Sequence, residues 1–430
     1  MAHSHTLTPL AALEGHDGRA WGVAWSPDGE RENEIERAAN CACVPTRSPR
    51  SSLIHISHSQ GATLASCGAD RTIRLWTRSP DTCSTGGEAG TEPHLFTCTA
   101  ILEESATRTI RTLAWSPCGA RLAAACFDAT TAVWEKEGSG ASATWRQAAV
   151  LQGHESEVKG VAWSPGGTHL ASCSRDKSVW VWEVVGDAAG SSSAVEYECA
   201  DVKQGHSGDV KAVAWHPAPE GVAGCSNPGG GFLVSAAYDE TLRVWADAGD
   251  EWVCAQVLGV GDAGHAGTVW CLDFEKPGGS GGPHHHQPPR LVSGGGDSTL
   301  RVWTCTPRPP GSAPDDDTSW KVETSLNNVH GGRPVYGVAW APPLGGSVPA
   351  APSTTPALPA RLASGGGDDA VRVWEEASPS AFVEVAVAKA DPPSEVNAVA
   401  WCPADRDVLA AAGDDGVVRV WRVVGQGKKM

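Results

Sequence analysis

Short apolar runs alternate with polar turns along the chain, and one apolar pattern recurs seven times. Each copy has thirteen residues, begins with Leu, carries Asp at the seventh position and ends with Trp. In the copy LASCSRDKSVWVW, apolar and small residues flank a charged centre, which predicts two short strands joined by a tight turn. The copies span residues 64–76, 122–134, 170–182, 233–245, 291–303, 362–374 and 409–421.

A second apolar segment precedes every copy and predicts a further strand. Apolar stretches such as residues 145–151 and 252–258 predict a fourth strand before the next unit begins. Residues 6–13 are expected to supply the outermost strand of the last unit, which closes a ring and removes free sheet edges. The preceding segments span residues 20–27, 110–117, 158–165, 210–217, 269–277, 335–342 and 396–403.

This arrangement resembles the WD40 repeat, in which each copy forms one four-stranded blade of a propeller. The resemblance implies an all-β, seven-bladed WD40 β-propeller closed by the N-terminal strand, with residues 6–423 as a single domain. It also implies that the Asp of each turn accepts a hydrogen bond from a His ahead of the first strand, which links on to a Ser and to the final Trp. Four units contain the full set: His16, Ser66, Asp70 and Trp76; His154, Ser172, Asp176 and Trp182; His206, Ser235, Asp239 and Trp245; His265, Ser293, Asp297 and Trp303.

Three units depart from this set. Units two and seven carry Ala124 and Ala411 in place of the Ser and also lack the preceding His. His330 of unit six lies one residue too early, so we expect its network to be disturbed. We interpret the His residues as structural groups and not as metal ligands or catalytic bases.

Composition and charge narrow the function. The 430 residues include 19 Trp, 50 Gly and 30 Pro but only 2 Met, which is typical of many short strands and turns. The net charge of −17 would repel nucleic acid and anionic lipid, so we expect neither as a partner. The sequence suggests neither a signal peptide nor a membrane-spanning run, and we expect a cytoplasmic protein.

The 14 cysteines form no CxxC pair, and we expect reduced thiols that are mostly buried. Cys41 and Cys43 form a CxC, but two ligands alone do not close a tetrahedral metal site. We therefore expect no bound metal and no cofactor.

Two positions of each unit are candidates for binding a partner. The first, which we call the turn slot, directly precedes the Asp, in the turn that WD40 propellers present on their top face. The second, the inner slot, lies at the start of each innermost strand. The turn slot holds Ala69, Phe127, Arg175, Tyr238, Gly296, Gly367 and Asp414, and the inner slot holds Trp21, Arg111, Lys159, Lys211, Trp270, Tyr336 and Asn397.

Basic residues of both slots fall on units two to four, with aromatic residues beside and opposite them. Exposed aromatic and Arg side chains carry much of the energy of protein interfaces. A site for an acidic or carboxylate-ending peptide is therefore favoured, although these charges could instead pair with neighbouring acids. The candidate partner-binding residues are Arg175, Arg111, Lys159, Lys211, Phe127, Tyr238, Trp21, Trp270 and Tyr336.

Three insertions interrupt the units at residues 30–61, 275–289 and 341–360. Their composition predicts disorder, and all three are expected on the face opposite the slots. Residues 30–61 are either a surface loop or translated intron.

Several stretches are more specific than a generic WD40 pattern. RTIRTLAWSPCGARLAAACFDATTAVWEKE, GHESEVKGVAWSPGGTHLASCSRDKSVWVWE, SGDVKAVAWHP and AGTVWCLDF resemble the WD40 subunit of the cytosolic iron-sulfur protein assembly machinery, the Cia-one family. The resemblance implies a non-enzymatic adaptor that promotes late transfer of [4Fe-4S] clusters to cytosolic and nuclear apo-proteins. It implies as partners the other subunits of the targeting complex, the iron-only-hydrogenase-like cluster carrier and the apo iron-sulfur proteins. It also implies that Arg175, in the SRDK stretch, takes part in docking, and that the location is cytoplasmic with the nucleus as a second compartment.

Two other classes of function compete with this reading. A ubiquitin-ligase substrate receptor or a chromatin-tail reader would usually carry an added module, for which the chain has no room outside its blades. A propeller hydrolase would need a nucleophile with a base or a metal in the channel, and the His residues are already assigned to the blade networks.

Overall fold

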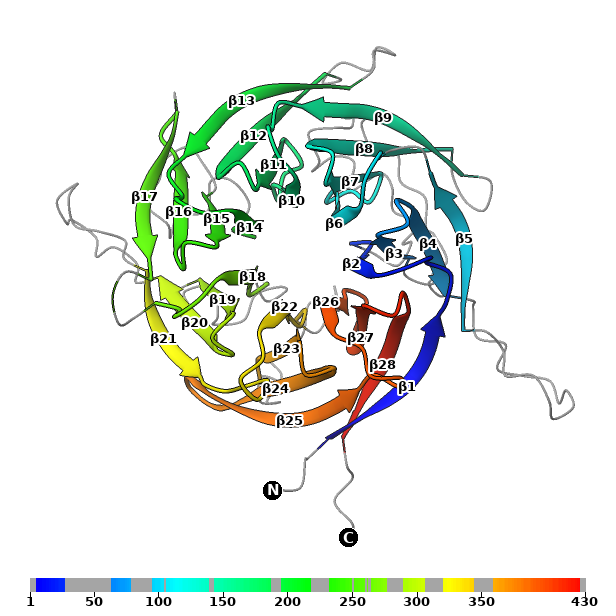
Figure 1. Ribbon diagram of the computed structural model, residues 1–430, viewed down its shortest axis with the longest axis vertical. Helices are drawn as coiled ribbons and strands as arrows, with labels where there is room; N and C mark the ends of the chain where they lie inside the picture. The colour runs from blue at the N-terminus through cyan, green and yellow to red at the C-terminus, as the bar shows by residue number, and fades with distance from the viewer. Residues whose placement is uncertain are drawn as a thin grey trace, which may run out of the picture.

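Seven four-stranded sheets surround a central axis and form a ring (Figure 1). Within the described residues we find no helix that could span a bilayer. The computed structural model describes residues 5–27, 63–78, 95–103, 106–138, 143–186, 195–217, 232–249, 251–259, 261, 264–276, 289–305, 320–343 and 359–425. The three predicted insertions lie outside these residues except at their ends, so their predicted disorder and their placement on one face stay predictions.

Each blade runs from an innermost strand at the axis to an outermost strand at the rim. The innermost strands of blades one to seven are β2 (Ala20–Trp25), β6 (Ile110–Trp115), β10 (Val158–Trp163), β14 (Val210–Trp215), β18 (Val269–Phe274), β22 (Val335–Trp340) and β26 (Val396–Cys402). The second strands are β3 (Thr63–Gly68), β7 (Arg121–Cys126), β11 (His169–Ser174), β15 (Phe232–Ala237), β19 (Arg290–Gly295), β23 (Arg361–Gly366) and β27 (Asp405–Gly413). The third strands are β4 (Ile73–Arg78), β8 (Thr130–Glu137), β12 (Ser178–Val185), β16 (Leu242–Asp247), β20 (Leu300–Cys305), β24 (Ala370–Ser378) and β28 (Val418–Gly425). The outermost strands are β5 (Phe96–Leu102), β9 (Thr144–Gln152), β13 (Glu196–Gln204), β17 (Trp252–Leu258), β21 (Trp320–Leu326), β25 (Ala381–Lys389) and, in blade seven, β1 (His5–Leu13).

Strand β1 closes the ring. It pairs antiparallel with β28, with His5 opposite Gly425 and Leu13 opposite Val418. The two ends of the described chain therefore lie in one blade (Figure 1). The predicted closure by the N-terminal strand is confirmed.

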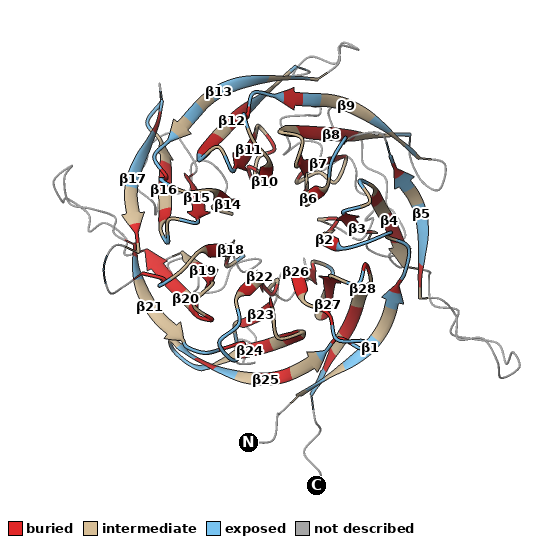
Figure 2. Ribbon diagram, viewed as in Figure 1, coloured by how far each residue is buried: buried red, intermediate tan, exposed pale blue. Residues whose placement is uncertain are grey.

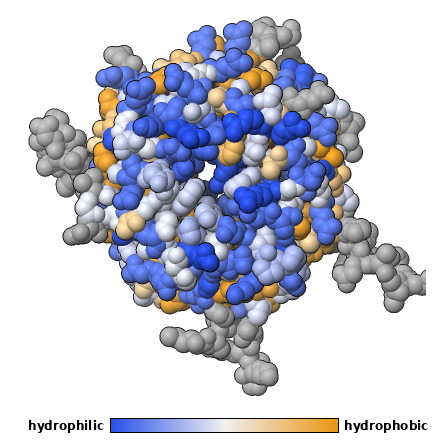
Figure 3. Space-filling view, viewed as in Figure 1, coloured by the Kyte–Doolittle hydropathy of each residue, from blue (hydrophilic) through white to orange (hydrophobic). Residues whose placement is uncertain are grey.

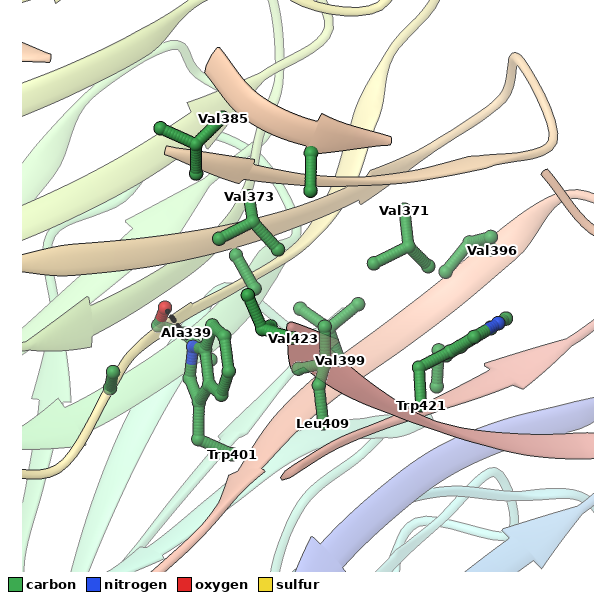
Figure 4. Close-up of a cluster of buried hydrophobic side chains, with 14 residues drawn as sticks. Ala339, Val371, Val373, Val385, Val396, Val399, Trp401, Leu409, Trp421 and Val423 are labelled. Carbon is green, nitrogen blue, oxygen red and sulfur yellow. Dashed lines mark hydrogen bonds between the residues drawn. The ribbon is translucent and has the colours of Figure 1, made fainter. Parts of the chain in front are cut away.

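The core lies between neighbouring blades, because each twisted sheet packs its apolar face on the next. Buried residues concentrate on the inner three strands, whereas most of the exposed residues within strands lie on the outermost ones (Figure 2). At the joint of blades six and seven, Val371 and Val373 pack against Val399 and Trp401 (Figure 4). Burying an aliphatic side chain of this size contributes about 1.5–3 kcal/mol, so the joints account for much of the stability.

Indole hydrogen bonds also tie adjacent innermost strands together. Trp401 Nε1 donates to the backbone oxygen of Ala339 in the preceding blade at 3.1 Å. Blade five has Phe274 at this position, and Trp340 Nε1 of blade six has no hydrogen-bond partner among the described residues. There Arg290 contacts Glu376 and lies 5.1 Å over the Trp340 ring. The same indole bond joins Trp25 to Ala400, Trp115 to Ala24, Trp163 to Ala114 and Trp215 to Ala162.

A four-residue network holds the turn of blade three. Trp182 Nε1 donates to Ser172 Oγ at 3.0 Å, and His154 Nε2 lies 2.9 Å from the same oxygen. His154 Nδ1 lies 2.8 Å from the Asp176 carboxylate, which also accepts the backbone N–H and the hydroxyl of Ser178. Because an indole N–H can only donate, the Ser172 hydroxyl proton is free for His154 Nε2, which leaves Nδ1–H for Asp176. All members are thereby satisfied without a charged imidazole.

The same contacts recur in blades one, four and five. The His Nδ1 lies against the Asp carboxylate, and the His Nε2 and the Trp indole both lie against the Ser hydroxyl. The sets are His16, Ser66, Asp70 and Trp76; His206, Ser235, Asp239 and Trp245; His265, Ser293, Asp297 and Trp303.

Blade six also forms the network, so the expectation that it is disturbed was wrong. His330 contacts Asp368 and lies 3.0 Å from Ser364 Oγ, which accepts the Trp374 indole N–H at 3.0 Å. The extra residue between His330 and the strand is taken up by Gly331 and Gly332, at φ of 61° and 82°. Glycine adopts this left-handed conformation without a steric penalty, so the histidine keeps its place.

Blade two lacks the network, as the sequence indicates. Thr107 replaces the histidine as donor to Asp128, through its backbone N–H at 2.7 Å and its hydroxyl at 3.1 Å. With Ala124 in the Ser position, the buried Trp134 Nε1 has no partner among the described residues. An unsatisfied buried donor costs about 1–3 kcal/mol, so blade two lacks a stabilising contact that its neighbours have.

Loss of the turn carboxylate should destabilise the fold, whereas loss of the neighbouring arginine should not. We expect Asp176→Ala to lower the free energy of unfolding by about 1–3 kcal/mol, because His154 and two backbone N–H groups lose their acceptor. Arg175→Ala is the control, since its exposed ion pair is worth about 0–1 kcal/mol. Urea denaturation of both variants measures the difference, and equal stabilities would contradict the role given to Asp176.

The Asp carboxylates of these networks should also make the free energy of unfolding depend on pH. Burial alone would raise the pKa of Asp176, but hydrogen bonds from His154 and Ser178 outweigh it and hold the pKa below its usual range. The pKa of Asp70 is lowered in the same way, by His16, to about 2. Because an unfolded Asp has a pKa of about 3.9, the unfolded chain binds more protons as the pH falls.

The stabilisation is therefore present above about pH 4 and is lost as the pH falls toward 2. We expect the free energy of unfolding to decrease over this window, and to decrease less steeply in Asp176→Asn by up to about 1.4 kcal/mol per pH unit. Urea denaturation at several pH values between 2 and 5 measures both slopes. Identical slopes would mean that Asp176 does not titrate with folding.

Candidate functional site

The seven turn-slot residues lie on one face of the ring because each is bonded to the entry of its own blade. In blade three, the backbone N–H of Arg175 donates to the carbonyl of Glu157, two residues before the inner slot. We call the face that carries these turns the top face. The equivalent bonds join Ala69 to Arg19, Phe127 to Thr109, Tyr238 to Asp209, Gly296 to Thr268, Gly367 to Pro334 and Asp414 to Glu395.

The inner-slot residues are brought to the same face by a β-bulge. In blade three the pairing of β10 with β11 shifts between Val158 and Gly160, which leaves Lys159 as the unpaired residue. A bulge re-aims the side chain of its extra residue. The same shift occurs at Trp21, Arg111, Lys211, Trp270, Tyr336 and Asn397.

The basic inner-slot residues each contact an aromatic ring. The Arg111 guanidinium lies 5.0 Å from the Trp21 ring centroid. The Lys159 ammonium lies 3.9 Å from the Phe127 centroid. These cations are only partly accessible, and burial lowers the pKa of both Arg111 and Lys159. Both cations are therefore occupied by contacts within the protein. Their charges are less available to a partner than the sequence indicates.

Lys211 lies between two rings. Its ammonium lies 5.0 Å from the Trp270 centroid and 5.7 Å from the Tyr238 centroid, and 3.2 Å from an Asp209 carboxylate oxygen. Trp270 in turn meets Tyr336 edge to face at 5.5 Å. Tyr238 itself is 62% exposed, the largest exposure among the large hydrophobic residues described.

Arg175 is both exposed and paired. Its side chain is 59% exposed, and its guanidinium lies 3.2 Å from Glu157. Glu157 also contacts Lys159 at 3.4 Å and Arg108 at 3.3 Å. Although partial burial opposes the effect, Arg175 and Lys159 hold the pKa of Glu157 below its usual value. The guanidinium points away from the sheet interior, as a docking residue requires, and an internal acid holds it in position.

Sequence reasoning missed Arg108 and Glu157. Arg108 is 58% exposed, donates to the backbone oxygen of Phe127 at 2.9 Å and reaches Glu157. Arg108, Phe127, Glu157 and Arg175 line a shallow depression between blades two and three. For Glu157 the signal was available two residues before each inner slot, where the residues are Arg19, Thr109, Glu157, Asp209, Thr268, Pro334 and Glu395; Arg108 lies one residue earlier and had no such signal.

Hydrophilic residues surround a narrow opening at the centre of the ring (Figure 3). The thiols of Cys67, Cys173 and Cys271 lie in the second and innermost strands, are buried, and have pKa values raised by that burial. Within the described ranges no group of three His, Cys, Asp or Glu side chains is arranged to hold a metal ion. Cys41 and Cys43 lie outside those ranges.

The sequence was then compared with known proteins. The family model for the WD domain, G-beta repeat, matches residues 7–31, 48–77, 96–135, 145–183, 197–246, 253–304 and 387–422.

Three named relatives align over most of their length. A probable cytosolic iron-sulfur protein assembly protein CIAO1 homolog of Chlamydomonas reinhardtii is 38% identical, over 97% of this chain and 98% of the relative. A probable cytosolic iron-sulfur protein assembly protein Ciao1 of Culex quinquefasciatus is 34% identical, over 97% of this chain and 98% of the relative. A probable cytosolic iron-sulfur protein assembly protein 1 of Chaetomium globosum is 31% identical, over 74% of this chain and 83% of the relative. The resemblance drawn from the repeats is thereby confirmed, and the chain belongs to the cytosolic iron-sulfur protein assembly protein 1 (CIAO1) family of WD40-repeat propellers.

Proposed function

We propose that the protein is a non-catalytic scaffold of cytosolic iron-sulfur protein assembly. It promotes the late transfer of [4Fe-4S] clusters to cytosolic and nuclear apo-proteins by holding partner proteins together. Its partners are the other subunits of the targeting complex, the iron-only-hydrogenase-like carrier and the apo iron-sulfur proteins. Membership of a family whose members are named for this pathway supports the proposal.

The observation that carries the docking role is the Arg108–Glu157–Arg175 cluster. Both arginine side chains are more than half exposed, yet Glu157 holds each guanidinium within 3.3 Å. A side chain that is already in position loses little entropy when a partner binds, and Arg is enriched among the residues that dominate interface energies. Glu157 is shared by the two arginines of the cluster and by Lys159, so the guanidinium groups keep unpaired N–H donors, although Asp128 and Glu155 also line the depression.

This chemistry favours an acidic segment of a partner. A carboxylate can take up the guanidinium N–H groups that Glu157 leaves free, because Arg presents five donors. Phe127 lines the same depression and offers apolar contact beside the charges. A polynucleotide would meet repulsion beyond the cluster, where the net charge of −17 is distributed.

Reversing the charge at Arg175 should remove a partner without unfolding the protein. We expect Arg175→Glu to lose at least one subunit of the targeting complex in affinity purification, because it places a second carboxylate beside Glu157. The melting temperature should stay near that of the wild type, since an exposed ion pair contributes about 0–1 kcal/mol. In cells that depend on the variant, the activity of a cytosolic [4Fe-4S] enzyme should fall.

The matched control is Arg333→Glu. Arg333 is an exposed arginine of the top face in blade six, so the variant makes the same change in net charge across the ring from the cluster. It should retain the partner that Arg175→Glu loses. Retention of every partner by Arg175→Glu, or its unfolding, would refute this docking site.

A further inference from the structure

The top face differs between blades two to four and blades five and six. In blades two and four the turn slot carries Phe127 and Tyr238, whose rings contact inner-slot lysines. In blades five and six the turn slot is Gly296 and Gly367. The turn slots of blades five and six therefore place no side chain beside Trp270 or Tyr336.

The fold does not require glycine at either position. Neither Gly296 nor Gly367 has a φ in the left-handed range. A Cβ built on Gly296 would come no closer than 3.5 Å to any neighbour, which is ordinary van der Waals contact. A Cβ on Gly367 would lie 3.5 Å from the Tyr336 ring and 3.6 Å from a Glu395 carboxylate oxygen. A Cβ fits at both positions, so the glycines are not required by packing, and they place no side chain beside the two partly exposed rings.

The faces of these two partly exposed rings can attract cations. Lys211 already places its ammonium 5.0 Å from the Trp270 centroid, where the negative face of an indole favours positive charge. Trp270 and Tyr336 meet at an interplanar angle of 82°, so their faces point in different directions. Tyr336 has no cation over its ring among the described residues.

Negative charge lies beside the second ring. Burial raises the pKa of Tyr336, and the carboxylates of Glu395 and Asp414 raise it further, against a smaller opposing effect of Arg333. Asp414 is engaged by Arg19 at 3.2 Å and by the Asn397 amide at 2.8 Å. Glu395 forms no ion pair with any cation that the structure describes.

We infer that Trp270, Tyr336 and Glu395 form a docking surface for a cationic side chain, an arginine or lysine within a basic segment of a partner protein. The cation lies over the Tyr336 ring and pairs with Glu395, as Lys211 lies over Trp270 and pairs with Asp209. The surface is separate from the Arg108–Glu157–Arg175 cluster and opposite to it in chemistry. The inference rests on the proposed function in one respect, namely that partner proteins dock on the top face.

A small probe tests the surface on the whole chain without any partner. The protein is labelled with 5-fluorotryptophan, the ¹⁹F resonance of Trp270 is assigned with Trp270→Phe, and acetyl-Gly-Arg-Gly-amide is titrated in. We expect a saturable shift of this resonance, and none with the same peptide carrying neutral citrulline or glutamate. No shift, or an equal shift with citrulline, would overturn the inference. Equal binding of a free polyamine would show a site for small cations and overturn the assignment to a protein segment.

Variants locate the binding. Glu395→Gln should weaken binding of the arginine peptide about two- to fivefold, and Gly367→Arg should abolish it by placing an internal cation over the ring. The controls are Glu155→Gln, which removes an exposed carboxylate from blade three, and Gly367→Ala, whose Cβ fits. Both controls should bind as the wild type does. Loss of peptide binding in either control variant would contradict the site. Unchanged peptide binding in both Glu395→Gln and Gly367→Arg would also contradict it.

Two further variants separate this inference from the proposed function. Lys211→Met should strengthen binding of the arginine peptide about two- to fivefold, because it frees the face of Trp270 from its internal cation. Arg175→Glu should leave the binding of this peptide unchanged while it loses an acidic partner. Failure of the peptide titration together with loss of a partner in Arg175→Glu would reject the cation surface alone.

Discussion

The satisfaction of one carboxylate in each turn is the constraint on which the rest of this structure depends. In all seven blades the Asp Oδ1 accepts the backbone N–H two residues further on. The residue between them adopts a positive φ in every blade, although six of the seven are not glycine. A non-glycine residue in this conformation costs about 1 kcal/mol or more, and the hydrogen bonds of the Asp offset that cost. The network of His, Ser and Trp is added to this turn in five blades, so it reinforces a geometry that the Asp already defines.

A fixed turn determines which side chains can reach a partner. Since the Asp points inward, the residue before it points outward, and its N–H is bonded to the entry of the innermost strand in every blade. The bulge beside that bond brings one further side chain to the same face. Two positions per blade can therefore change chemistry without disturbing the core. The contrast between Arg175 and Gly367 at the same slot shows how far that freedom extends.

Most of the fold followed from the sequence because seven copies repeat the same spacing. The strand pairs, the ring closed by residues 5–13 and the face of the turn slot are all consequences of that spacing. The partners of individual charges were not predictable in the same way. Arg175 and Glu157 are 18 residues apart and meet only because the turn is bonded to the strand entry. The network of His330 was expected to be disturbed because the repeats show one extra residue between this histidine and the strand. Gly331 and Gly332 accommodate that residue, so the network forms. Periodicity defines the backbone, whereas side-chain pairing depends on bulges and turns that break the period.

The division of the top face also bears on how a partner is oriented. A surface that carries cations in just one sector attracts an acidic segment in either chain direction. When an exposed guanidinium cluster on blades two and three is followed by the aromatic rings of blades five and six and by the Glu395 carboxylate at the entry of blade seven, a reversed segment brings like charges together. Like-charge contact of this kind costs several kcal/mol at an interface, so discrimination comes from repulsion as much as from attraction. The proposed scaffold works by holding its partners in one arrangement, and opposite charges on separate sectors of one ring are a direct way to do so.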